Sequence, residues 1–292
     1  MTRRAAHCHQ RPEGGTRSRP PRAKKRFGQH FLERAWAAKV ADAVAAGAGE
    51  TIVEIGPGRG AITARLIESA GRVIAFEIDR DLAATLRQQA SPNLTVVEGD
   101  FLDLTPNQFA DHVLRAGGGG GPIRVAGNLP YNAASPILFK LTEIAAAGVP
   151  LADATVMLQR EVADRVLADP GSGDYGVLTV LIRHRASAER LLQLPPGAFR
   201  PPPKVHSTVI RLRFHGPEPP VVNDEVFARL TQAMFTRRRK TLANALAAYR
   251  PGEHLDAADM LALAGIDGTR RPETLSIPEI GRLADAYARA VL

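Results

Sequence analysis

The sequence predicts an α/β fold, with a mostly parallel sheet, helices on both faces of it, and a smaller all-helical domain after it. Short apolar segments alternate with helical patterns over the first two thirds of the chain, which is typical of a parallel sheet with crossover helices. One strand runs into a glycine-rich turn. From about Gly216 onward the pattern changes to short amphipathic helices only.

The expected elements follow from apolar periodicity and from breaks at glycine and proline. Strands are expected at 52–55, 73–78, 94–97, 123–126 and 153–158, and helices at 33–46, at 81–89 and from 161 onward. Two more strands, 187–194 and 205–214, flank a proline-rich hinge without a helix between them, which predicts an antiparallel hairpin at the edge of the sheet. Helices at 223–235, 239–249, 257–263 and 277–291 complete the chain.

The segment from Thr51 to Thr63 is a buried strand, a glycine turn and the start of a helix. Three glycines in alternation let the backbone of the turn approach a ligand closely. No Gly-Lys-Ser/Thr follows, which excludes a P-loop, and the G-x-G-x-G spacing differs from the dinucleotide fingerprint. This spacing, with Glu54 before the turn, resembles motif I of S-adenosylmethionine (SAM) methyltransferases. An ordinary turn in another α/β protein remains the alternative.

Acidic residues follow the next two expected strands. Glu77 ends the second strand, about 20 residues past the glycines, where a carboxylate grips both hydroxyls of a ribose. Asp100 follows the third strand and can accept a hydrogen bond from an adenine amino group, while Phe101 flanks the ring. A turn-forming or capping role is the alternative for Asp100.

The most specific motif is Asn128-Leu129-Pro130-Tyr131, directly after the fourth strand. It has the form of the (Asp/Asn)-x-x-(Tyr/Phe) motif of enzymes that methylate amino groups of bases. Such a nitrogen is a poor nucleophile, and two acceptors, Asn128 Oδ1 and the Leu129 carbonyl, can free its lone pair by holding its protons. Tyr131 offers a face on which the base stacks. We therefore assign Asn128, Leu129 and Tyr131 to catalysis.

Several motifs follow one another along the chain from about Lys24 to its end: KKRFGQHFL, VEIGPGRGAIT, FEID, GDFLDL, NLPYNAASPI, FRPPPKVHSTVIRL and FTRRRKTLANAL. In this order they resemble the KsgA family of small-subunit (16S) rRNA adenine dimethyltransferases. The resemblance implies a Rossmann-like SAM-dependent domain with a seven-stranded sheet and a helical RNA-docking domain. It also implies dimethylation of two adjacent adenosines near the 3′ end of the small-subunit rRNA, in an immature ribosomal subunit.

The resemblance also assigns positions within the site. It places the methionyl end of SAM against His30, Leu32, Gly56 and Asn128, the ribose on Glu77, and the adenine beside Asp100. Phe199 becomes a second wall for the target base. The full set of expected cofactor contacts is Gln29, His30, Leu32, Gly56, Gly58, Glu77, Asp100, Phe101 and Asn128. No metal is expected.

Charge divides the chain into three parts. Residues 1–26 carry nine basic side chains and one acid, equal to the net charge of +8, and lack apolar periodicity, which predicts a disordered basic tail. We expect the SAM-dependent domain at 27–215 and the helical domain at 216–292. Excess positive charge in the C-terminal part suggests a polyanionic partner. Its basic patch, expected to contact RNA phosphates, is Arg237, Arg238, Arg239 and Lys240.

Composition narrows the remaining possibilities. No apolar run reaches membrane-spanning length, no secretory signal is present, and the single cysteine, Cys8, fits a reducing cytoplasm and rules out a Cys-based metal cluster. A monomeric cytoplasmic enzyme is expected. The competing functions are dimethylation of a large-subunit rRNA adenine, an RNA-binding or transcription cofactor that has lost turnover, and a nicotinamide dehydrogenase.

Overall fold

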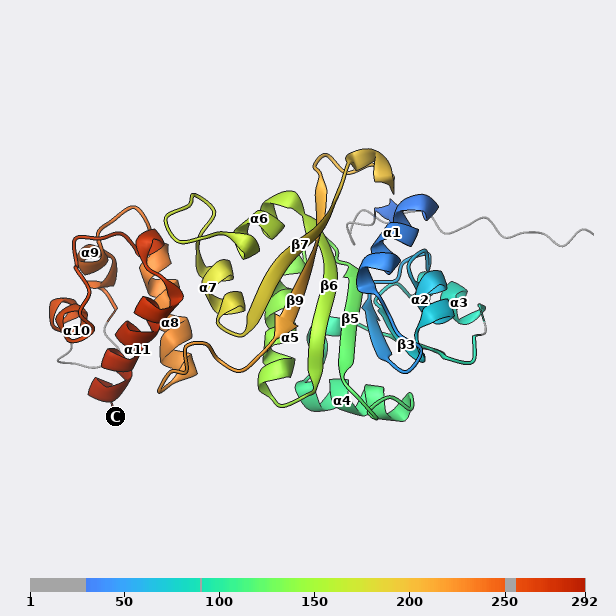
Figure 1. Cartoon of the computed structure of the whole chain (residues 1–292), viewed down its shortest axis with the longest axis horizontal. Helices are drawn as coiled ribbons and strands as arrows, with labels where there is room; N and C mark the ends of the chain where they lie inside the picture. The colour runs from blue at the N-terminus through green and yellow to red at the C-terminus, as the bar shows by residue number, and fades with distance from the viewer. Residues whose placement is uncertain (1–29, 90, 250–255, 292) are drawn as a thin grey trace, which may run out of the picture.

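The structure is a computed structural model that describes residues 30–89, 91–249 and 256–291 (Figure 1). The expected basic tail, 1–26, and the expected cofactor contact Gln29 lie outside the described residues. At the N-terminal end of the described chain, β1 (Phe31–Leu32) pairs antiparallel with β8 (Phe199–Arg200) in a two-stranded sheet. This small sheet joins two segments that are far apart in the sequence.

The main sheet has seven strands in the order β4-β3-β2-β5-β6-β9-β7. Pairing is parallel from β4 to β6, and only β9 runs antiparallel to its neighbours. The strands are β2 (Thr51–Ile55), β3 (Arg72–Glu77), β4 (Leu94–Glu98), β5 (Ile123–Asn128), β6 (Leu151–Gln159), β7 (Ala186–Leu194) and β9 (Ser207–Phe214). The predicted mostly parallel, seven-stranded sheet is confirmed.

Helices cover both faces of this sheet, because successive strand residues point to opposite sides. Val53 and Ile55 pack in one core with α4 (Pro106–Arg115), α5 (Ala134–Ala146), α6 (Arg160–Leu167) and α7 (Val177–Arg183). Ile52 packs in the other core with α1 (Arg34–Val44) and α2 (Thr63–Ser69). Helix α3 (Arg80–Arg87) lies against β3 and β4.

The predicted antiparallel hairpin at the edge of the sheet is confirmed. Strand β9 pairs antiparallel with β6 on one side and with the outer strand β7 on the other. Helix α7, which precedes β7, was not predicted. Pairing on both sides of β9 satisfies backbone groups that the sequence pattern cannot assign to a neighbour.

The C-terminal helices form a separate lobe beside α7, at the opposite end of the molecule from α2 and α3 (Figure 1). They are α8 (Asp224–Thr236), α9 (Leu242–Leu246), α10 (Ala257–Leu263) and α11 (Ile277–Val291). Their apolar faces share one core, which also includes Tyr175 and Val180 from the segment around α7. Helix α7 therefore contributes to both cores, because Ile182 packs against the sheet.

Helix α9 is shorter than the predicted 239–249. Residues 237–240 form a turn, in which the Lys240 amide donates to the Arg237 carbonyl, and Thr241 is extended before the helix begins. Three 3₁₀ turns complete the described secondary structure: η2 (Phe101–Asp103), η3 (Pro196–Ala198) and η4 (Pro272–Thr274). In the part of the chain that the structure describes, no helix is long and apolar enough to cross a membrane.

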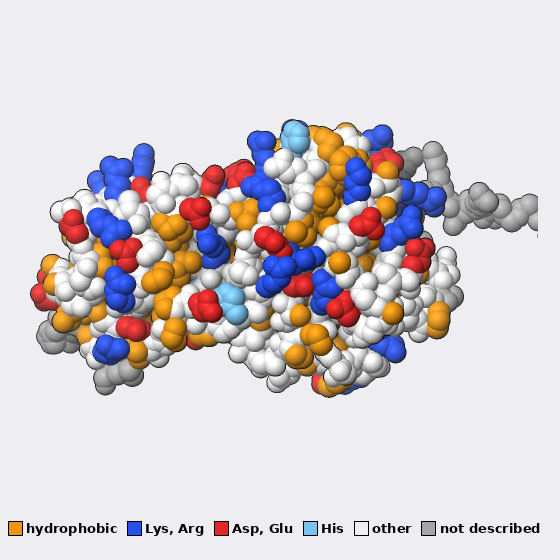
Figure 2. All heavy atoms as spheres, in the orientation of Figure 1, with side chains coloured by type: hydrophobic (Ala, Val, Ile, Leu, Met, Phe, Trp, Pro, Cys, Tyr) orange, Lys and Arg blue, Asp and Glu red, His pale blue; other side chains and the backbone are white. Residues whose placement is uncertain are grey.

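Basic and acidic side chains are mixed on one face of the molecule. Figure 2 shows basic and acidic side chains together near its centre. Nη1 of Arg213 in β9 lies 2.7 Å from Oε1 of Glu189 in β7. Nη2 of Arg190 in β7 lies 2.7 Å from Oδ1 of Asp164 in α6. Since these arginines have acidic partners, this face is not a uniformly basic surface.

Candidate active site

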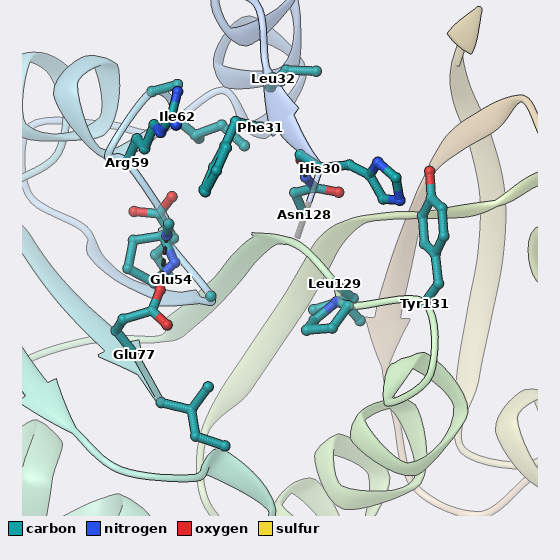
Figure 3. A pocket seen from close by; sticks show the side chains of 16 residues that line it. His30, Phe31, Leu32, Glu54, Arg59, Ile62, Glu77, Asn128, Leu129 and Tyr131 are labelled. Atoms are coloured by element: carbon teal, nitrogen blue, oxygen red, sulfur yellow. Dashed lines mark hydrogen bonds between the residues drawn. The ribbon is translucent and has the colours of Figure 1, made fainter. Parts of the chain in front are cut away.

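A cavity of about 90 Å³ lies at the edge of the sheet where β2, β3 and β5 end (Figure 3). The carboxyl ends of parallel strands meet at one edge, which is where α/β folds bind ligands. Besides residues of the glycine turn, the lining includes Glu54 of β2, Glu77 of β3, Asn128 of β5 and all of β1. The fold therefore gathers most of the residues that the sequence assigned to the cofactor and to catalysis.

The glycine turn forms one wall of this cavity. Gly56 and Gly58 have φ values of 67° and 59°, a left-handed conformation that side chains disfavour. A Cβ at Gly56 would lie 3.8 Å from the Asn128 carbonyl oxygen, and one at Gly58 would lie 3.3 Å from the Phe31 ring. Both glycines thus keep the space between the turn and the opposite wall open.

Glu77 ties the glycine turn to the end of β3. Its two carboxylate oxygens accept from the Gly58 and Asp79 amides, each at 2.9 Å. Burial raises the pKa of this carboxyl, and the nearby Asp79 acts in the same direction, while the two amides lower it. Each oxygen keeps a further lone pair, so the carboxylate can still accept two ribose hydroxyls.

Glu54 is the other carboxylate of the cavity. It lies in β2 between Val53 and Ile55, is 1% exposed, and its Oε2 atom has no hydrogen-bond partner. Burial raises the pKa of Glu54 to about 7, with the Glu77 charge adding to the effect. A buried acid at the wall of an open cavity suits a ligand that brings positive charge.

A second cavity of about 270 Å³ adjoins the first and shares Gly56, Ile78 and Pro130 with it. Asp100 and Phe101 line this second cavity. One oxygen of Asp100 caps η2 by accepting from the Leu102 amide at 2.9 Å, so the capping alternative is correct for that oxygen. The expected adenine contacts and the expected ribose contact therefore lie in neighbouring cavities that share part of their lining.

Asn128 has a fixed orientation. Its Nδ2 donates to the His30 carbonyl oxygen at 3.0 Å. The His30 ring nitrogen Nδ1 is in turn 2.8 Å from the Pro201 carbonyl oxygen, which holds this segment against the proline-rich hinge. Because the amide nitrogen is engaged, the acceptor Oδ1 is the atom that Asn128 presents to a ligand.

Tyr131 is held at the other side of the cavity. Its hydroxyl lies 2.8 Å from the Ser207 hydroxyl, and burial raises the pKa of the phenol. The His30 ring stacks on Tyr131 with centroids 5.4 Å apart. Leu129 is buried, and its amide donates to the Met157 carbonyl at 3.1 Å, which fixes the path of the chain between Asn128 and Tyr131.

Phe199 does not lie where a base could stack on it. Its side chain is fully buried in the core between the sheet and α1, and it does not line either cavity. It pairs across β1 with Leu32. The assignment of Phe199 as a second wall for the base is therefore not supported by this structure, since its apolar ring gains more from packing beneath β1.

The predicted basic patch lies in the helical lobe, in the turn between α8 and α9. Arg237, Arg239 and Lys240 are exposed. Arg238 is partly buried, and its Nη2 donates to the Ser172 carbonyl oxygen at 3.2 Å. Its Nε lies 3.9 Å from Oε2 of Glu273. Three of the four cations are thus available to an external partner, whereas Arg238 anchors the turn.

The two adjoining cavities fit SAM. The buried carboxylates Glu54 and Glu77 suit its positive charges and its ribose, and the apolar residues around Phe101 suit its adenine. Asn128 and Tyr131, beside these cavities, suit an amino group on a planar base. The fold and this site define a SAM-dependent methyltransferase.

The chain belongs to the ribosomal RNA adenine dimethylase family, which matches residues 21–288. It is 46% identical over 261 residues to ribosomal RNA small subunit methyltransferase A of Aromatoleum aromaticum, covering 88% of this chain and 91% of the relative. The corresponding protein of Geobacter sulfurreducens is 42% identical over 274 residues, covering 92% and 96%. The predicted family and its SAM-dependent rRNA adenine dimethyltransferase activity are confirmed.

Solved structures agree on the fold. A dimethyladenosine transferase from Plasmodium falciparum has a TM-score of 0.70 at 23% identity, covering 87% of this chain and 96% of that one. The 23S rRNA methyltransferase ErmE has a TM-score of 0.61 at 26% identity, covering 88% and 98%. The sheet and the helical lobe together are therefore shared with both proteins.

Some contributors to the site were missed in the sequence. Phe31, Arg59 and Ile62 line the first cavity, and Ser207 holds Tyr131. Phe31 and Ile62 look like ordinary core residues of their segments. Arg59 stands inside the glycine motif, and its position there was the one available signal that it lines the cavity.

Replacing Glu77 with alanine should weaken SAM binding at least about tenfold, because hydrogen bonds to a charged group disappear and the Gly58 amide loses its acceptor. Isothermal titration calorimetry would measure this affinity. Glu98→Ala is the matched control, since Glu98 pairs in register with Glu77 on β4 but pairs with Arg87 at the surface. An unchanged affinity in the Glu77 variant would remove this residue from the ribose site.

Proposed function

We propose that this enzyme dimethylates two adjacent adenosines near the 3′ end of small-subunit rRNA. Its proposed substrate is an immature small ribosomal subunit, on which it works as a monomer in the cytoplasm. The observation that carries the reaction is the orientation of Asn128, whose Nδ2 is committed to His30. The choice of the small subunit is supported by relatives at 42–46% identity with that substrate in their names.

The chemistry depends on how the protein presents the adenine amino group. The lone pair of this nitrogen is delocalised into the ring, so the group is planar and poorly nucleophilic. Asn128 Oδ1 and the Leu129 carbonyl accept its protons and favour a pyramidal nitrogen, while the aromatic ring of Tyr131 positions the base. SAM, when bound, supplies an activated methyl group, and no strong base is needed because the nitrogen becomes acidic as its new bond forms.

Two contacts hold Tyr131 in place before the base binds. The Tyr131 hydroxyl is held by Ser207, and His30 stacks on one face of its ring. The target base therefore stacks on the remaining face of the ring. Acceptors that are already oriented need no reorganisation at the moment of reaction, and such preorganisation supplies much of the rate enhancement in many enzymes.

The deciding experiment is incubation with SAM and immature small subunits, followed by mass spectrometry of the rRNA nucleosides. The proposal expects dimethyladenosine at two adjacent positions near the 3′ end. Large-subunit rRNA in a parallel reaction is the control, because the structure resembles ErmE as well. Modification of the large-subunit RNA alone would overturn the substrate assignment and leave the reaction class intact.

The exposed cations of the turn between α8 and α9 should contact RNA phosphates. Replacing Arg237, Arg239 and Lys240 together with glutamine should weaken RNA binding and flatten its dependence on salt, by roughly 0.7–0.9 log unit of slope for each phosphate that is no longer neutralised. Filter binding over a salt series measures both quantities. Arg229→Gln is the control, because this lobe arginine pairs with Glu225. An unchanged salt slope in the triple variant would mean that the patch only meets solvent.

A further inference from the structure

The cavity beside the glycine turn has one wall that neither the family resemblance nor the proposed reaction assigns. Arg59 lines this wall, and its guanidinium carbon lies 4.1 Å from the centre of the Phe31 ring. Phe31 is itself fixed by β1 pairing and by close approach to Gly58. A guanidinium group stacked on a fixed aromatic ring has a preferred position and is less mobile than one surrounded by solvent.

The labelled residues that line the cavity lie in three places in Figure 3. Asn128 and Tyr131 lie at one end, Glu77 lies below, and Arg59 lies beside Phe31 and Ile62 at the end away from Tyr131. The sulfonium of SAM also has three branches: the methyl group, the adenosyl group and the aminocarboxypropyl chain. The methyl group must face Asn128, and the ribose belongs to Glu77, so the third branch is left with the Arg59 end.

The third branch ends in an α-carboxylate and an α-ammonium group. The carboxylate is the one negative charge of SAM, and Arg59 and His30 are the basic residues among those lining the cavity. His30 stacks on Tyr131 at the catalytic end, whereas Arg59 lies against Phe31 at the other end. We propose that Arg59 binds the α-carboxylate of the methionyl group of SAM and thereby aligns the sulfonium with the target base.

This inference rests on the proposed use of SAM in this cavity. Arg59 occupies the second x position of the G-x-G-x-G motif in this chain. A guanidinium can grip a carboxylate with two parallel N–H···O bonds. Arg59 is exposed, so solvent reduces the strength of this contact. The expected contribution is therefore about tenfold in affinity rather than a thousandfold.

Calorimetry with SAM and with decarboxylated SAM tests the assignment directly, because the two compounds differ only in the carboxylate. The wild-type protein should bind decarboxylated SAM about tenfold more weakly than SAM. Arg59→Gln should bind both compounds with the weaker affinity, and Arg59→Lys should restore part of the difference. Arg65→Gln, in α2, is the matched control, since Arg65 pairs with Glu68 and does not line the cavity.

Two results would overturn the inference. One is an Arg59→Gln variant that still prefers SAM over decarboxylated SAM as strongly as the wild type. The other is an unchanged affinity for SAM together with weaker RNA binding, because Arg59 also borders an outer groove with Arg34 and Arg200, where it would then meet phosphates. A wild-type protein that binds neither compound would instead contradict the use of SAM itself.

Discussion

Replacing Asn128 with alanine should lower the single-turnover rate of adenine methylation at least about a hundredfold, and should weaken RNA binding far less. Its Oδ1 atom is presented to the site because Nδ2 is bonded to the His30 carbonyl. An acceptor that acts mainly as the nitrogen becomes pyramidal stabilises the transition state more than the bound base. Rapid-quench measurement with labelled SAM and saturating RNA gives this rate.

The aspartate variant separates the two roles of the Asn128 amide. Asn128→Asp keeps an acceptor oxygen but loses the donor to His30, so the carboxylate faces a carbonyl oxygen. We expect it to retain more activity than the alanine variant and to bind SAM less well, since His30 belongs to the β1 segment that borders the cavity. Thermal melting of both variants checks that the fold is kept. A near-normal rate in Asn128→Ala would contradict the proposed role.

Replacing Glu54 with glutamine should make the protein more stable at alkaline pH and leave its stability near pH 5 almost unchanged. Glu54 is buried, and burial raises its pKa from 4.5 to about 7. A raised carboxyl pKa means that the folded state favours the protonated form. Its contribution to stability is therefore complete below pH 4.5 and is lost as the pH rises through 7.

The size of the expected change in stability follows from the pKa shift of Glu54. A change from 4.5 to about 7 corresponds to roughly 3 kcal/mol between acid and alkaline pH. Urea denaturation at about pH 5 and about pH 8.5 should show that difference in the wild type and not in Glu54→Gln. Saturating SAM should also stabilise the wild type more than the variant at alkaline pH, because its positive charges offset the buried carboxylate.

Glu50→Gln is a control of opposite sign. Burial would raise the Glu50 pKa, but the Gly47 amide and the Arg124 guanidinium hold it below its ordinary value. Its carboxylate therefore adds stability above about pH 4.5, and its replacement should cost stability at alkaline pH. If Glu54→Gln behaves like Glu50→Gln, then Glu54 is ionised and paired in the folded protein, and the argument from burial is wrong.

Local chemistry in the sequence was sufficient for the fold class and for much of the site. The alternation of strands and helices, the glycine turn and the acidic strand ends each depend on neighbouring residues only. Because parallel strands align their carboxyl ends, residues that end β2, β3 and β5 had to meet at one edge. Glu77 and Asn128, which lie 51 positions apart in the numbering, could therefore be placed at one candidate site from the sequence, and both line the same cavity.

The tertiary structure decided what depends on contacts between distant segments. The pairing of β1 with β8 buries Phe199, which the sequence placed beside the base, and brings Phe31 over the glycine turn. The same segment supplies the carbonyl that orients Asn128. No local periodicity reports such contacts, since their energy comes from surfaces that meet only after the chain has folded.

The sequence alone thus determined which residues have the chemistry for methyl transfer to a base, because side-chain identity and strand-end position carry that information. Only the tertiary structure decided which atoms those residues present. It leaves Asn128 Oδ1 to act as the acceptor, leaves an oxygen of Glu54 without a partner, and sets Arg59 against Phe31 at the far end of the cavity. Hydrogen bonds and burial fix these choices, and both depend on neighbours that are remote along the chain.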